Sequence, residues 1–487
     1  MMDQGLKASQ YKTYDVDNIP QAGVYNAPPA GSNWHGEAVA GVPLFPDETP
    51  GNPRLGRFVV QGYQDLWAAV IFLATLVMTL AWGSYNLATY VPPVNGTVIG
   101  NSDTPISDLG GDVFALLAVN LMVSVAGACG SLVLLNCFPR QLIFIANGMT
   151  AVMALVAAVL SFIMGQIFAG VMLVIMCGLQ ALWLYLVRDR IPFSAELLKA
   201  SLSILMRYKA VFLFTFGLGV LSIVYVFFWG YTVFPVLNRL NSGNGGVGDG
   251  VLITFLMLLF FWTAQVGSNV MHVTTAGVTA TWYFAGEDRM PSNPTLASFK
   301  RAVTTSFGSI CFGSLIVAII RTLRWMAESS RNNENDFLRC IALCLISCLE
   351  SAMEYFNTYA FVHVAVYGCG YIEAAKRTWQ LCKQCFFAAY FNDALIGSTL
   401  GLLSLAVSAL IGVAVGLLYT SIILGVLAFF VSLLVHINFF SAVESAVTTL
   451  FVCFAEVPEG LQHSAPELYA AMHAADQNGT NNNAMNP

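Results

Sequence analysis

Apolar runs without a single charged side chain recur along the chain, separated by short polar segments. The runs over 141–187, 250–286 and 394–443 contain no Asp, Glu, Lys or Arg. A helix needs about 20 apolar residues to cross the hydrocarbon core of a bilayer. The first and third runs are therefore long enough for two spans each, with turns expected near 165–170 and 419–420. The middle run is long enough for one.

The remaining apolar runs predict one membrane-spanning helix each, over 66–82, 113–135, 210–231, 302–320 and 355–372. The expected fold class is therefore all-α, a polytopic integral membrane protein with about ten transmembrane helices. Residues 1–63 are polar and rich in Pro and Gly, which predicts a disordered cytoplasmic tail. Residues 64–443 would form the transmembrane domain, and 444–487 a second cytoplasmic tail. An amphipathic helix on the inner surface is expected over 188–209, which holds five basic residues.

Composition and charge support a membrane protein and indicate its orientation. The chain is 57% hydrophobic and only 10% charged, a balance that excludes an ordinary soluble protein. Basic residues concentrate on the cytoplasmic side of membrane proteins. Ten spans place sixteen of the 21 Lys and Arg on the side of the N-terminus, so we expect both termini in the cytoplasm. Four of the five exceptions lie between Arg321 and Arg339, where either the loop is outside or the neighbouring spans are irregular.

The first loop predicted on the outer side carries a glycosylation signal. Residues 84–112 contain no Lys or Arg and three Asp, and they include the sequon Asn95-Gly96-Thr97. Both features are typical of a segment outside the cytoplasm. We therefore expect a glycan on Asn95.

The run over 250–286 carries polar side chains that a lipid-facing helix does not need. Gln265, Asn269 and His272 fall at i, i+4 and i+7 and share one helix face. Polar groups at membrane depth are tolerated chiefly where they face protein or water, so this face is the first candidate for a substrate path. His272 has two interpretations: it bonds to a neighbouring helix, or it exchanges a proton against a cation. Asp393 and Glu444 are expected at helix ends, where carboxylates are usually solvated.

Motifs of enzyme chemistry are absent from the sequence. It has no phosphate loop, no His-Glu-x-x-His and no Gly-x-Ser-x-Gly. Cys382-x-x-Cys385 lacks the second pair that a zinc site needs, and we interpret it as ordinary cytoplasmic thiols. The sequence therefore predicts no enzyme activity, no metal site, no cofactor and no nucleic-acid partner.

Four segments resemble the choline transporter-like family, and in particular its fungal and protist branch with the "pH nine sensitive" protein. They are N-V-M-H-V-T-T-A-G-V-T-A-T-W-Y-F over 269–284, S-F-G-S-I-C-F-G-S-L over 306–315, F-N-D-A-L-I-G-S-T-L-G over 391–401, and V-E-S-A-V-T-T-L-F-V-C-F-A-E-V-P-E, which begins at Val443. The resemblance covers roughly residues 64–469, and the second segment is its most specific part.

The resemblance implies a transporter of choline or a related small organic cation in the plasma membrane, with an internal membrane as the alternative. Transport would proceed by facilitated diffusion or in exchange for protons. Two other functions stay open: a transporter or channel for another solute, and a non-transporting scaffold or lipid-organising protein. The partners expected are the cation, protons and the lipid bilayer, and the oligomeric state is left open.

A quaternary ammonium ion has no N–H to donate and is held by aromatic ring faces. The aromatic residues that we assign to the substrate path are Trp262, Trp183, Tyr185 and Tyr225. Each can instead anchor its helix at the membrane interface, where Trp and Tyr are enriched.

Small residues at helical spacing mark close helix contacts. Gly308 and Gly313 lie in the 306–315 signature, and two Gly-x-x-x-Gly patterns follow in the last apolar run. Such surfaces let helix backbones approach closely. We therefore expect helix packing at Gly308, Gly313, Gly397, Gly401, Gly412 and Gly416.

Overall fold

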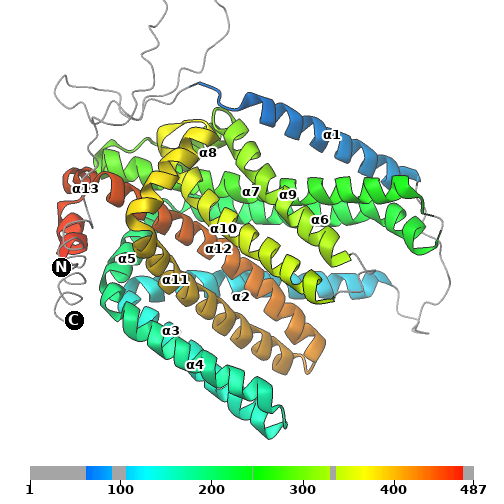
Figure 1. Cartoon of the computed structure of the whole chain (residues 1–487), viewed down its shortest axis with the longest axis horizontal. Helices are drawn as coiled ribbons and strands as arrows, with labels where there is room; N and C mark the ends of the chain where they lie inside the picture. The colour runs from blue at the N-terminus through cyan, green and yellow to red at the C-terminus, as the bar shows by residue number, and fades with distance from the viewer. Residues whose placement is uncertain (1–61, 90–105, 244, 330–335, 475–487) are drawn as a thin grey trace, which may run out of the picture.

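The computed structural model describes residues 62–89, 106–243, 245–329 and 336–474, and within these ranges it contains helices and no strand. Ten of the helices are long and apolar enough to cross a membrane, which confirms the all-α class and the number of spans (Figure 1). They are α1 (Leu66–Thr89), α2 (Ile106–Cys137), α3 (Pro139–Ile163), α4 (Ile167–Val187), α6 (Ala210–Asn241), α7 (Val247–Ala285), α9 (Phe307–Ser329), α10 (Asp336–Tyr367), α11 (Tyr371–Leu418) and α12 (Ile422–Glu456). Asn95 and the tail over 1–61 lie outside the described residues.

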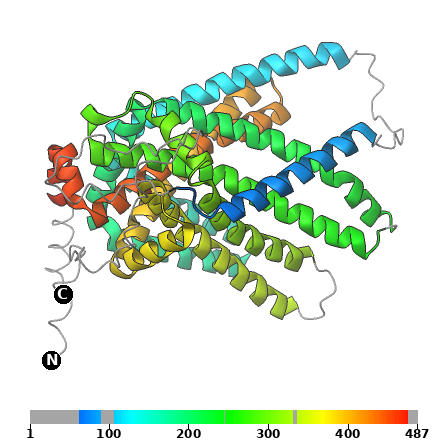
Figure 2. The ribbon, with the colours of Figure 1, turned by 90° about the horizontal axis from the view of Figure 1, so that it is seen from above.

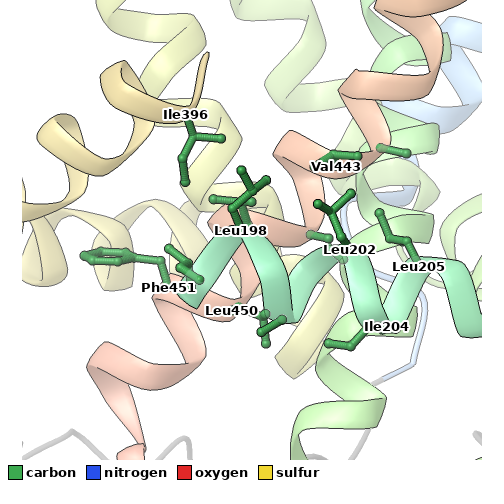
Figure 3. Close-up of a cluster of buried hydrophobic side chains, with 14 of the residues drawn as sticks. Leu198, Leu202, Ile204, Leu205, Ile396, Val443, Leu450 and Phe451 are labelled. Carbon is green, nitrogen blue, oxygen red and sulfur yellow. The ribbon is translucent and has the colours of Figure 1, made fainter. Parts of the chain in front are cut away.

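Shorter α-helices are α5 (Ile191–Arg207), α8 (Pro294–Val303) and α13 (Pro458–Ser464), and a further helical segment runs over 466–474. The prediction of an amphipathic helix at α5 is confirmed, but α5 is buried within the bundle. Leu198 and Leu202 on its apolar face point toward Ile396 of α11 and Val443 of α12, and Leu450 of α12 lies on the opposite side of α5 (Figure 3). Burying one such leucine stabilises the fold by roughly 2 kcal/mol, so α5 is a core element of the bundle.

The last two long helices differ from the expected spans. Helix α11 begins at Tyr371 rather than near 394, and its backbone leaves helical geometry at Cys385, with φ −133° and ψ 22°. Helix α12 continues past Val443 to Glu456. Asp393 and Glu444 therefore lie inside helices, and the expectation that they sit at helix ends is wrong.

The helices lie close together at the end of the bundle where α5 and α13 sit, and they spread apart toward the opposite end (Figures 1 and 2). Burial follows the same division. Residues 270–281 of α7 are all buried, and residues 442–454 of α12 are buried except for Glu444. Near the other end, Val251 and Phe255 of α7 and Ile422 of α12 are exposed. The protein core therefore sits at the narrow end.

Candidate substrate site

His272 ties α7 to two neighbouring helices at the narrow end. Its Nε2 lies 2.9 Å from the Thr358 carbonyl oxygen of α10, and its Nδ1 lies 2.7 Å from Ser445 Oγ of α12. A carbonyl oxygen only accepts, so Nε2 carries the proton, and in the neutral ring Nδ1 accepts from the hydroxyl. Both nitrogens are used within the protein, and the side chain is only 8% exposed. This geometry matches the first interpretation of His272, a bond to neighbouring helices.

The other two polar residues on this face of α7 contact α9. Asn269 Nδ2 donates to Ser314 Oγ at 2.9 Å. The amide oxygen of Gln265, in the orientation that satisfies both groups, accepts from Arg321 Nη1 and Nη2 at 3.0 and 3.1 Å. The predicted polar face therefore exists as one surface, but its groups hold α7 against α9, α10 and α12.

Two arginines of α9 pair with two glutamates of α10 in the described part of the segment 321–354. Arg321 Nε lies 3.0 Å from Glu350 Oε1, and Arg324 Nη1 lies 2.6 Å from Glu350 Oε2. Arg321 also pairs with Glu354. The charges of these four residues therefore belong to two long helices, α9 and α10, and face each other between them.

A second polar cluster lies on α10, α11 and α12, where the sequence predicted none. Tyr359 donates from its hydroxyl to Asp393 Oδ2 at 2.5 Å, and Tyr355 donates to the Tyr359 hydroxyl at 3.3 Å. Glu444 of α12 faces the same stretch of α11. A Cβ placed on Gly397, one turn beyond Asp393, would lie 4.0 Å from Glu444 Oε1. The two carboxylates therefore face the same region between α11 and α12.

Aromatic rings surround this cluster. The ring centroid of Tyr355 lies 5.1 Å from that of Tyr359, 6.2 Å from Phe386 and 6.4 Å from Tyr390. Trp183 of α4 packs edge-on against Tyr390 at 6.1 Å. The region thus combines negative charge with ring faces, which is the chemistry that binds an organic cation.

Of the four aromatic residues predicted for the substrate path, only Trp183 contacts this cluster. Tyr185 is 59% exposed, with the Arg188 guanidinium 4.5 Å above its ring. Trp262 is buried and donates from Nε1 to the Cys311 carbonyl oxygen at 2.9 Å. Tyr225 lies nearly parallel to Phe260. These three do not form a common cage with Trp183 in the structure.

Four of the six predicted packing glycines make close contacts. A Cβ on Gly308 would overlap the backbone of Gln64 and Asp65, just before α1, and one on Gly313 would overlap the rings of Tyr371 and Phe361. Gly412 and Gly416 both lie against Gly425 in the hairpin of α11 and α12.

The first Gly-x-x-x-Gly pattern of α11 does not pack in this way. Gly397 meets only Glu444, and a Cβ on Gly401 would meet nothing within 4 Å. The structure therefore gives Gly401 no helix contact, and this face of α11 stays open on the side of the carboxylates.

Two regular spacings in the sequence indicate this cluster. Tyr355 and Tyr359 are spaced i, i+4 on α10, and Asp393, Gly397 and Gly401 are spaced i, i+4, i+8 on α11. Such spacing places each set on one helix face. A carboxylate followed by two glycines on one face indicates open space beside a charge.

The residues of the cluster all lie within the part of the chain that a known family model matches. A family model described as "Plasma-membrane choline transporter" matches residues 171–459. A CTL-like protein from Dictyostelium discoideum is 32% identical over 85% of this chain and 75% of its own length. Protein PNS1 from Gibberella zeae is 29% identical over 84% of this chain and 82% of its own length. Protein PNS1 from Eremothecium gossypii is 32% identical over 69% of this chain and 64% of its own length.

Proposed function

Because the chain belongs to the choline transporter-like family of multi-pass membrane proteins, we propose that it moves choline or a related small organic cation across the plasma membrane. Both termini then lie in the cytoplasm, and the substrate crosses without chemical change. The observation that carries the proposal is the pair of carboxylates between α11 and α12: Asp393 bonds to Tyr359, beside the rings of Tyr355 and Tyr390, and Glu444 lies against Gly397, one turn further along α11.

The free-energy cost of placing charged side chains in a membrane domain indicates that these carboxylates have a function. A charged side chain within a membrane domain is expensive, and such residues mark substrate or ion pathways by default. Glu444 is the one exposed residue in an otherwise buried stretch of α12, over 442–454. A cation that enters this region gains a carboxylate partner and ring faces, and a desolvated cation–π contact is worth about 2 kcal/mol.

The two carboxylates have different surroundings, which assigns them different tasks. Asp393 accepts a 2.5 Å hydrogen bond from Tyr359, which fixes the position of its carboxylate. No described side chain donates a hydrogen bond to Glu444, so this carboxylate is free to bind the cation or a proton. Because a protonated Glu444 attracts no cation, binding of a proton and of substrate at this residue would exclude each other. That exclusion is what proton exchange requires, and His272 is the weaker candidate for it because both its ring nitrogens are bonded.

Uptake of labelled choline into proteoliposomes tests the proposal. Glu444→Gln keeps the size of the side chain but removes its charge, and we expect at least about a tenfold loss of uptake, since a charge-assisted contact contributes roughly 1.5–3 kcal/mol. Glu467→Gln is the matched control, because Glu467 is an exposed carboxylate beyond α13. Wild-type uptake by the Glu444 variant would overturn the assignment of the site.

The same assay separates the other functions. Choline uptake that unlabelled quaternary ammonium compounds block supports the proposed substrate class. A wild-type protein that takes up another solute but not choline would be a transporter or channel for that solute. Complete absence of uptake from correctly folded protein would favour a scaffold or lipid-organising role.

A further inference from the structure

Arg301 of α8 lies in a part of the protein that the substrate site does not use. Its side chain turns toward α7, where a Cβ on Gly277 would lie 3.2 Å from Arg301 Nη2. The guanidinium lines a cavity of about 10 Å³, together with Ser298, Ser306 and Gly368. A cavity of this size holds roughly one water-sized group.

The guanidinium has no acidic partner among the described residues. Its one side-chain hydrogen bond runs from Nη2 to Ser298 Oγ at 3.2 Å, although an arginine carries five N–H donors. No residue that lines the cavity bears a carboxylate. Asp65, on the neighbouring segment before α1, is occupied by Ser309 Oγ and the Tyr371 backbone N–H, both at 2.8 Å.

Other donors point toward the same space. Ser298 and Ser306 are 3% and 5% exposed, and no hydrogen bond of the Ser306 hydroxyl occurs within the described residues. Burial also lowers the pKa of Arg301, because the charged form loses hydration that no described anion replaces. The Arg301 side chain is partly buried, and its guanidinium gives up hydration without an acidic partner among the described residues, so an anion at the cavity would complete the arrangement.

We propose that this pocket binds a phosphate group, with Arg301 as its main ligand and the hydroxyls of Ser298 and Ser306 as further donors. A planar guanidinium matches the oxygens of phosphate with two parallel hydrogen bonds. The cavity admits one phosphate oxygen while the rest of the group stays at its mouth. Since α8 lies on the side assigned to the cytoplasm, the phosphate belongs to an inner-leaflet lipid headgroup or to a soluble cytoplasmic compound.

Binding would stabilise the narrow end of the bundle. The pocket joins α7 at Gly277, α8 at Arg301, the turn before α9 at Ser306 and the turn after α10 at Gly368. An anion there would hold four elements together. Its binding is therefore measurable as a rise in thermal stability of the full-length protein.

The test uses purified full-length protein in phosphatidylcholine nanodiscs. The melting temperature is measured against inorganic phosphate at constant ionic strength, and separately in nanodiscs that also contain phosphatidylinositol 4-phosphate. A rise with inorganic phosphate identifies a soluble ligand, and a rise only with the phosphoinositide identifies a lipid headgroup. No rise with either probe overturns the proposal.

Three variants make the test specific. Arg301→Gln should weaken the response about tenfold or more, while Lys300→Gln, which changes an exposed neighbour on the same helix, should leave it unchanged. Gly277→Ala keeps the charge but places a methyl group 2.9 Å from Ser298 Oγ, so it should also abolish the response. Without phosphate, Arg301→Gln should melt close to the wild-type temperature, since it removes a partly buried charge that has no acidic partner among the described residues. Equal losses in the Arg301 and Lys300 variants would show general electrostatic attraction and refute the pocket.

Discussion

The hydrogen bond from Tyr359 to Asp393 offers a graded test of the substrate site. Tyr359→Phe removes the hydroxyl that donates to Asp393 at 2.5 Å and leaves the ring in place. A hydrogen bond to a charged group contributes roughly 1.5–3 kcal/mol. Without it the carboxylate loses both its fixed position and part of the stabilisation of its negative charge. If all of this loss is felt by the bound cation, the half-saturation concentration for choline rises about tenfold to a hundredfold.

Tyr355→Phe is the matched control within the same cluster. It removes the hydroxyl that donates to Tyr359 at 3.3 Å, a neutral and longer bond one step farther from the carboxylate. Neutral hydrogen bonds contribute about 1 kcal/mol, so we expect at most about a fivefold effect. The order of the two variants follows from the bonds that they remove, a charge-assisted bond to Asp393 for Tyr359 and a neutral one to Tyr359 for Tyr355.

The measurement is choline uptake over a range of concentrations in proteoliposomes, corrected for the amount of folded protein. The double variant with Asp393→Asn tests whether the tyrosine acts through the carboxylate. In that background, loss of the Tyr359 hydroxyl should add little, because residues that share one interaction are not additive. A role of Tyr359 through Asp393 is refuted if Tyr359→Phe transports normally or if Tyr355→Phe has the larger effect. It is also refuted if the effects of Tyr359→Phe and Asp393→Asn simply add.

Three further predictions concern other parts of the molecule. His272→Gln should lower stability by about 1–2 kcal/mol and leave the pH profile of uptake unchanged, since both ring nitrogens bond within the protein; a shifted profile would show that His272 titrates during transport. Gly313→Leu should abolish uptake, with Gly313→Ala less severe, because the added side chain overlaps Tyr371 and Phe361 and overpacking costs typically 1–3 kcal/mol; normal uptake by the leucine variant contradicts the tight contact. Lys199→Cys should not react with an impermeant thiol reagent on intact cells, and Asn95 should carry a glycan, because the two positions are expected on opposite sides of the membrane. Labelling at position 199 would show the reverse topology.

Helix number follows from the sequence because uncharged length alone determines it. A run such as 394–443 can only be two spans in a bilayer, whatever packs against it. The polar face of α7 followed from spacing for the same reason, since helical periodicity fixes which side chains share a side. Both features are local, so the sequence contains them in full.

The partners of the charged residues depend on which helices are neighbours, and no local pattern reveals that. Arg321 and Glu350 are far apart in the chain, and only the hairpin of α9 and α10 brings them to 3.0 Å. Asp393 could be located only after α11 proved to begin at Tyr371, because the basic residues before it had indicated a loop. Trp183 reaches the cluster through the contact of α4 with Tyr390, which spacing along one helix cannot show.

The kink at Cys385 gives α11 the form of a lever with a short arm and a long arm. At 1.5 Å per residue, the helix beyond the kink is about 50 Å long, whereas Asp393 lies only about 12 Å from the pivot. A change of about 5° at the kink would move the far end by about 4 Å and Asp393 by about 1 Å. Because Gly412 and Gly416 hold α12 to the long arm, the hairpin would swing as one piece. A bend at the kink would therefore open and close the wide end of the bundle while Asp393 stays nearly still.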